Sequence, residues 1–354
     1  MIRNELPHET YLEMALTYMR WNLDRDAAAV LKEAPAHPTA AYMLSRLALP
    51  DSPEESRTYF EKASALSPRL VFPFREEEIP LYEWAASVKP DDWKPKYYLG
   101  LILWSKGRVE EARELFDRCD GADFAPLFLA RAMLHRDSDP VRAAADYERA
   151  IALDEKSWRS RHLLFGFRTG RNEFDQALSV AQKAADLFPA EGPVKVDLVK
   201  ALLNVGRPAE AAAVLDGLRA LPFEGASEIH SLFVRAHLEL GAGAMKQGDW
   251  AGAVRELERS KEYPESLGSG QPFDPDVRLQ DYLLGLAYDR LREKAKSAAA
   301  FQAVVDFSLK FPDRGGPGAD VGALALRRAG QAAKAAEVGK RASPPPRAVA
   351  EALR

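Results

Sequence analysis

Residues 94–119 have the sequence KPKYYLGLILWSKGRVEEARELFDRC, and this stretch decides the fold. Its first half carries apolar residues at helical spacing, and its second half carries another apolar stripe with the same period. Gly107 lies between the two halves, where glycine readily ends a helix because it tolerates positive φ. The pattern predicts two short helices joined by a tight turn. Their expected apolar faces are Tyr98, Leu99, Leu101, Ile102 and Trp104, then Val109, Ala112, Leu115 and Phe116.

The second helix of this hairpin recurs along the chain. A small residue stands four places before a larger one, as Ala112 does before Phe116, and the later equivalents of Phe116 follow at steps of 31, 34, 34, 42 and 44 residues. One hairpin cannot bury both of its apolar faces, so repeated hairpins must stack on one another. The equivalents of Phe116 are Tyr147, Ala181, Leu215, Leu257 and Phe301, and those of Ala112 are Ala143, Ala177, Ala211, Ala253 and Ser297.

The spacing resembles the tetratricopeptide repeat family. Leu99-Gly100 followed by Ala112-x₃-Phe116 matches the family pattern, and so does Leu284-Gly285-x₂-Tyr288, whereas Lys96 and Leu103 stand where the family most often has Trp and Tyr. The resemblance implies an all-α fold, a right-handed superhelical solenoid of antiparallel helix pairs. We expect about eight to nine repeats, one of them degenerate.

The chain divides into four expected parts. Residues 1–68 form N-terminal repeats, 69–92 a degenerate repeat, 93–312 the main array, and 313–354 capping helices and a tail that begins at Ser343. The segment RLVFPFR at residues 69–75 is too short and too interrupted by proline for a full helix. Because one helix is missing there, we expect few apolar contacts and a weak joint.

Composition limits the classes of partner and compartment. The net charge of −4 over 354 residues argues against general nucleic-acid binding, which needs a basic surface. No run of about eighteen apolar residues exists to span a membrane, and residues 1–14 lack the apolar core of a secretory signal. The single cysteine, Cys119, forms no internal disulfide and is expected to be buried and unreactive. These features favour a cytoplasmic protein.

A second resemblance covers most of the chain. The segments ELPHETYLEMAL, VFPFREEEIPLYEWA and YLLGLAY are similar to the C-terminal repeat region of large bacterial proteins. In those proteins the array follows an N-terminal β-rich domain of uncharacterised function, for which a carbohydrate-related role is one expectation. This resemblance implies an alternative role as an accessory module whose partner is another domain of a longer polypeptide.

The sequence offers no pattern for catalysis or for a bound cofactor. It contains neither an HExxH nor a CxxC spacing, and His230 and His237 are about 10 Å apart along one helix without a third ligand. Gly241-Ala242-Gly243 falls inside a helical period and follows no strand, so it indicates close helix packing rather than a nucleotide loop. We therefore expect no enzyme activity, no metal and no cofactor.

What remains is the concave groove, which the first helices of such arrays line. Aromatic side chains interleaved with cations suit an acidic protein or peptide segment, or alternatively sugar hydroxyls and faces. Lys200 and Asn204 supply only part of the residue set with which related arrays hold a peptide carboxylate. The expected function is a noncatalytic scaffold for protein–protein interaction. Its candidate groove residues are Lys94, Tyr97, Trp104, Arg131, Arg159, His162, Lys200, Asn204, Arg235 and Tyr282, with Met245 and Asp289 farther along.

Overall fold

The computed structural model describes residues 6–221 and 226–353. In these residues all regular elements are helical, and the only β-type pairing is an isolated bridge between Gly316 and Ala342. The chain forms two compact units, residues 1–160 and 161–354, which are called the first and second units below. None of the helices in the described parts combines the length and the apolar character needed to cross a bilayer. The predicted all-α fold is confirmed.

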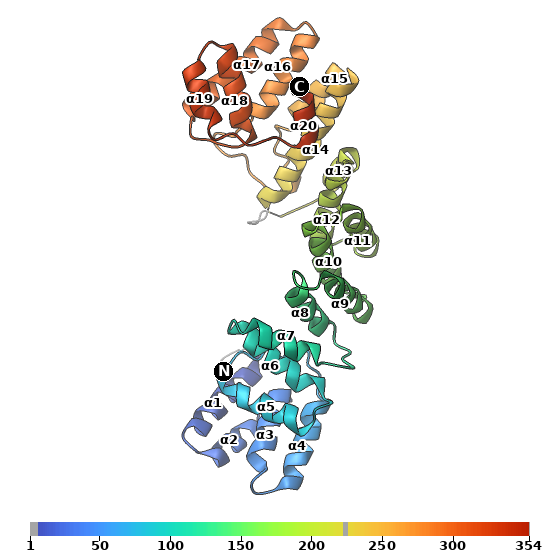
Figure 1. Cartoon of the computed structure of the whole chain (residues 1–354), viewed down its shortest axis with the longest axis vertical. Coiled ribbons are helices and arrows are strands. Elements are labelled where there is room, and N and C mark those ends of the chain that lie inside the picture. The colour runs from blue at the N-terminus through green and yellow to red at the C-terminus, as the bar shows by residue number, and fades with distance from the viewer. Residues whose placement is uncertain (1–5, 222–225, 354) are drawn as a thin grey trace. The chain divides into compact units, whose positions relative to one another are not determined.

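The first unit is built from helix pairs that follow one another along the chain (Figure 1). The partners in each pair pack together, and a short turn joins them, so they run antiparallel. Its elements are α1 (Pro7–Arg20), α2 (Asp24–Lys32), α3 (Pro38–Ala48), α4 (Pro53–Ala65), the 3₁₀ turn η1 (Glu76–Glu78), α5 (Ile79–Val88), α6 (Trp93–Ser105), α7 (Val109–Asp117), α8 (Ala125–His135) and α9 (Pro140–Leu153).

The second unit repeats this arrangement of an α-solenoid, beginning within α10. Glycines with positive φ end several first helices here as in the first unit, for example Gly206 at φ 74° and Gly107 at φ 78°. Its elements are α10 (Trp158–Gly170), α11 (Phe174–Leu187), α12 (Gly192–Asn204), α13 (Pro208–Asp216), α14 (Ala226–Gln247), α15 (Trp250–Arg259), η2 (Glu265–Leu267), α16 (Arg278–Arg290), α17 (Lys294–Lys310), α18 (Pro317–Arg328), α19 (Ala332–Gly339) and α20 (Arg347–Ala352).

The helix pairs approach closely because the first helix has a glycine opposite a large side chain of the second. A methyl group added at Gly100 would overlap the Phe116 ring. At Gly285 the added carbon would lie 2.8 Å from Phe301, and at Gly241 it would lie 2.8 Å from Leu257. The small-then-large pattern therefore marks direct contacts between the two helices of a pair. The interpretation of Gly241 as a packing glycine is confirmed.

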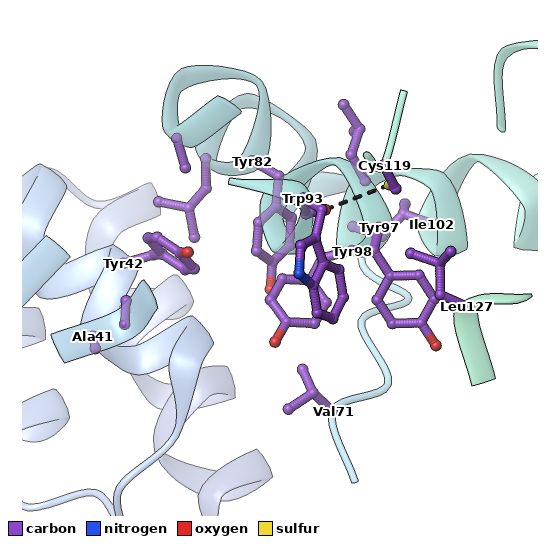
Figure 2. Packing of buried hydrophobic residues seen from close by; sticks show 14 of the residues in the cluster. Ala41, Tyr42, Val71, Tyr82, Trp93, Tyr97, Tyr98, Ile102, Cys119 and Leu127 are labelled. Atoms are coloured by element: carbon purple, nitrogen blue, oxygen red, sulfur yellow. Dashed lines mark hydrogen bonds between the residues drawn. The ribbon is translucent and has the colours of Figure 1, made fainter. Parts of the chain in front are cut away.

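The degenerate segment is only partly packed. Residues 69–75 contain no helix; Val71 is buried, whereas Leu70, Phe72 and Phe74 are 61%, 61% and 51% exposed. The core continues past this segment through α5, which packs against both α3 and α6, with the Tyr82 ring lying 6.3 Å from that of Tyr42 and 5.3 Å from that of Tyr98 between centroids (Figure 2). The segment itself therefore makes few apolar contacts, and the weak joint expected there stays a prediction.

Cys119 lies in this same core, only 2% exposed, and its thiol faces the carbonyl oxygens of Trp93 and Leu115 at 3.5 and 3.3 Å (Figure 2). Burial raises the pKa of the Cys119 thiol to about 12, so at neutral pH the thiolate needed for reaction is scarce.

The chain end also differs from the expected tail. After α18 and α19 pack as a pair, residues 343–346 lead into α20, which packs against α14 (Figure 1). Val349 of α20 is fully buried. The last helix therefore belongs to the core of the second unit rather than to a free terminus.

We expect Gly241→Ala and Gly243→Ala to have opposite effects on stability. The first forces Leu257 to move and should cost about 1–3 kcal/mol of the free energy of unfolding. The second adds a carbon that meets nothing within 4 Å, in the interior of the same helix. It should stabilise by about 0.5–1 kcal/mol, because alanine restricts the unfolded chain. Urea denaturation followed by circular dichroism measures both. Equal effects would show that Gly241 has no packing role.

We also expect the Cys119 thiol to react with Ellman's reagent only when the first unit opens. The rate in native buffer should be at least about a hundredfold below that in denaturant, because the sulfur is buried and protonated. Rapid native labelling would mean that the core around Trp93 opens readily.

Candidate functional site

The candidate groove residues of the first unit are mostly committed to the protein's own structure. Lys94 donates hydrogen bonds from Nζ to the carbonyl oxygens of Ser64 and Leu66, at 2.5 and 2.8 Å, and so satisfies the C-terminal end of α4. Tyr97 is buried, packed on Trp93, Phe116 and Phe124. The expectation that these two side chains face a ligand was wrong.

The other three candidates of the first unit do not form an open cationic row. Trp104 is half-buried, with its ring edge-on to Phe116 at 6.4 Å, so it is not the exposed anchor expected. Arg131 makes a two-pronged ion pair with Asp146 of α9, at 2.8 and 2.6 Å. Arg159 is exposed and lies over the Trp158 ring at 4.7 Å.

The second unit gathers four of its seven candidates, His162, Lys200, Asn204 and Arg235, on three successive first helices. They lie on α10, α12 and α14, and α12 contacts α14 directly. Tyr282 on α16 is different: it is buried, with its ring edge-on to Phe301 at 5.3 Å. The sequence predicted that Tyr282 lines the groove, whereas its side chain points into the core. Of the two remaining candidates, Met245 is buried, so its expected place in the groove was wrong, and Asp289 pairs with Lys294 at 2.6 Å.

His162 pairs with a carboxylate of the next first helix. Its Nδ1 lies 2.7 Å from Oδ2 of Asp197, whose carboxylate is buried, while the imidazole is about half exposed. The hydrogen bond to Asp197 raises the pKa of His162 above its ordinary value, because the protonated ring is favoured beside the anion. The pair therefore holds a proton that an isolated histidine would release at lower pH.

The remaining cations of this row are paired in the same way. Lys200 Nζ lies 2.8 Å from Oε1 of Glu228 on α14. Arg235 binds Glu239 at 2.8 Å, and it also donates to Oδ1 of Asn204 at 3.3 Å and to the Leu203 carbonyl oxygen at 3.0 Å. Each first helix is thus tied to the next by a polar contact, so the row contributes to the stacking of repeats.

A pocket of about 430 Å³ opens beside these pairs. It lies within the second unit, between α12, residues 218–221 of the connection after α13, and the start of α14, with His162 of α10 at its edge. Lys200 and Arg219 contribute two positive charges, and Asp197 and Glu228 contribute two negative charges, so the lining is balanced while His162 is neutral. The apolar part of the wall is formed by Pro193, Val196, Leu218, Ala220, Leu221 and Ile229.

The pocket is lined mainly by apolar surface. Its size is that of pockets that enclose an apolar side chain or a small ligand, and Leu221 is 85% exposed beside it. Among the described residues, no three His, Cys, Asp or Glu side chains gather in a way that could hold a metal ion. The pocket combines an apolar wall with a rim of hydrogen-bonding groups.

Sequence reasoning missed the acidic half of the site, namely Asp197 and Glu228, and the apolar wall. One signal was available for Asp197. It follows His162 by 35 residues, close to one repeat, and residues one repeat apart occupy equivalent positions on neighbouring helices. The wall residues carry no such signal, because Leu218 to Leu221 lie in the irregular connection after α13.

Three family models describing the tetratricopeptide repeat match this chain, at residues 79–126, 168–232 and 234–259. The matched ranges cover α12 and α13 and most of α14. The first of these matches includes residues 94–119, from which the repeats were predicted. No curated protein matches the sequence.

Solved structures also resemble the chain at low identity. A tetratricopeptide repeat protein from Parabacteroides merdae is 14% identical over 79% of this chain and 98% of its own, with a TM-score of 0.35. PilF of Pseudomonas aeruginosa is 17% identical over 63% of this chain and 93% of its own, with a TM-score of 0.34. Naa15/Naa10 bound to HypK-THB gives 16% identity over 82% of this chain and 39% of that one, with a TM-score of 0.49.

We expect the His162–Asp197 pair to stabilise the second unit more at low pH than at high pH. Because the pKa of His162 is raised in the folded chain, its stabilisation is complete below the ordinary histidine pKa of about 6.5 and is lost as pH rises through the raised value. The melting temperature of His162→Gln should fall below that of the wild type by more at about pH 6 than at about pH 8.5.

A matched control is His230→Gln, which removes a histidine whose Nε2 lies 3.0 Å from a carbonyl oxygen, that of Glu262, instead of a carboxylate. In an NMR titration Asp197→Asn should lower the pKa of His162. If the pKa of His162 is at or below the ordinary value in the wild type, the two side chains do not form this pair in solution.

Proposed function

We propose that the chain is a noncatalytic scaffold that binds a segment of another protein on the first-helix face of its second unit. The observation that carries this proposal is the pocket between α12, residues 218–221 and the start of α14, with its apolar wall and its paired polar rim. Helical repeats commonly bind extended or helical segments on such a face. The tetratricopeptide repeat matches support a role in protein interaction in general.

The pocket favours an apolar anchor over an acidic one. Lys200 already has Glu228 as its partner, and His162 already has Asp197. An acidic ligand would have to displace these carboxylates, whereas an aliphatic or aromatic side chain can bury itself against Val196, Leu218 and Ile229 without breaking a pair. The acidic preference expected from the sequence is therefore left with Arg219, which lines the pocket and donates to the carbonyl oxygens of Asp216 and Leu218.

The alternative role, an accessory module of a larger carbohydrate-related protein, rests only on similarity of sequence segments. A sugar site needs an exposed aromatic face. Of the three candidate aromatics, Tyr97 and Tyr282 are buried and Trp104 is half-buried against Phe116.

The test is a peptide selection on the wild-type chain, followed by affinity measurements on two matched variants. Leu221→Glu places a charge on the exposed wall of the pocket, and Val141→Glu makes the same kind of change at an 82% exposed valine of the first unit. The selected peptides should carry an aliphatic or aromatic anchor. They should bind Leu221→Glu at least about tenfold more weakly, equivalent to 1.4 kcal/mol, and bind Val141→Glu as they bind the wild type.

Ionic strength separates an apolar ligand from an acidic one. Affinity should change little between about 0.05 and 0.5 M salt if burial of the anchor dominates, because screening weakens exposed charge contacts only. If the selected peptides are rich in Asp and Glu, and if their affinity falls steeply with salt, the partner segment is acidic, as the sequence predicted. Equal losses in Leu221→Glu and Val141→Glu would show that the pocket is not the binding site.

A further inference from the structure

The second half of α14 is mostly apolar. Residues 238–245, LELGAGAM, carry one charged side chain, Glu239, and Leu238, Ala242 and Met245 are all buried. Helix α15 covers one side through the close contact of Leu257 with Gly241, while residues 240, 243 and 244 are only partly buried. An apolar side that α15 does not reach needs another cover.

The chain's own last helix supplies part of that cover. Helix α20 packs on α14, and Val349 belongs to the same buried cluster as Leu238, Ala242 and Met245. Ala352 and Leu353 pack against this cluster as well, and Glu351 Oε2 lies 3.3 Å from Lys246 Nζ. The apolar residues of α20 therefore stand at positions i, i+3 and i+4, one face of a helix.

Helix α20 is the shortest α-helix of the second unit in the described part of the chain. It has six residues, far fewer than the roughly 12–15 that an isolated helix needs, and its N-terminal end has no side-chain cap. Residues 343–346, Ser-Pro-Pro-Pro, connect it to the bridge at Ala342. Its ion pair is exposed, with 74% of the Lys246 side chain and 40% of the Glu351 side chain accessible.

We propose that the surface of α14 around Leu238, Ala242 and Met245 is a helix-binding site, and that α20 is its resident ligand. The occupant that replaces α20 is an amphipathic helical segment of a partner protein. That segment presents an aliphatic residue, a carboxylate two places later and a leucine four places later, as Val349, Glu351 and Leu353 do. The proposal is independent of the pocket, which lies at the other end of α14.

The short tether makes α20 a competitor for the incoming segment. Residues 343–346, Ser-Pro-Pro-Pro, form a short, semi-rigid connection, and a short connection that spans the distance gives an effective concentration on the order of millimolar. If untethered α20 binds the vacant site with a dissociation constant of about 0.1 mM, the tethered site is open in about one molecule in ten, so any competing segment binds the wild-type chain about tenfold more weakly than it binds the vacant site. The partner must therefore offer more contacts than α20, or be locally concentrated.

The experiment uses the full chain and a fluorescent peptide with the sequence of residues 340–353. Val349→Asp places a charge in the buried face of α20 and should free the tail, so the variant should bind the peptide at least about tenfold more tightly than the wild type does. Arg347→Asp is the matched control, because Arg347 is 93% exposed on the same helix, and it should bind as the wild type does. A peptide carrying Asp at the position of Val349 should not bind either variant.

Hydrogen exchange keeps the proposal testable if Val349→Asp fails to fold. In the wild type the amides of α20 should exchange at least about a hundredfold faster than those of α16, because α20 opens without the rest of the unit. Equal protection of the two helices would make α20 a fixed part of the core and overturn the proposal. Equal peptide binding by the wild type and Val349→Asp would also overturn the proposal. So would a wild-type dimer that Val349→Asp abolishes, because α20 would then bind a second copy of the chain.

The pocket variant separates this site from the proposed function. Leu221→Glu should leave binding of the tail peptide unchanged, even where it abolishes binding of the selected peptides. Loss of both kinds of binding in Leu221→Glu would mean that one surface serves both, and would overturn the assignment of a separate site on α14.

Discussion

The close approach of paired helices is the constraint on which the structure depends. At Gly100, Gly241 and Gly285 the backbone of the first helix meets a large side chain of the second, and no Cβ fits between them. This distance fixes which face of each first helix is turned toward its partner. The opposite face is left for neighbouring repeats and for ligands, so the binding surface is a consequence of the packing contact.

The same geometry explains why cations on first helices do not form a free basic surface. Neighbouring first helices are close enough for side chains about one repeat apart to meet, as His162 meets Asp197 across 35 residues. A half-buried cation without a partner would be costly, and a carboxylate on the next helix offsets that cost. The charged row therefore strengthens the array first, and its effect on ligands is limited to the rim of the pocket.

The repeat architecture could be predicted from the sequence because it rests on local spacing. Ala112 and Phe116, together with their equivalents, report a contact between two helices that are adjacent in the chain. The candidate site could be predicted only in part. The sequence located His162, Lys200, Asn204 and Arg235 on first helices, but it did not give the carboxylates that neutralise them. Tyr97 and Tyr282 were predicted to line the groove but are buried. On one helix, a residue that faces the groove and a residue that faces the core can be adjacent in sequence.

The role of the last helix could not be predicted by counting repeats, because α20 packs on a helix about a hundred residues earlier in the chain. A physical signal was nevertheless present in α14. Residues 238–245 are apolar except for Glu239, more uniformly so than one packed face requires, so some further element was needed to cover part of them. That element is α20, which comes from the same polypeptide and packs on α14. A first helix whose apolar residues extend beyond its packed face therefore indicates that another element covers it.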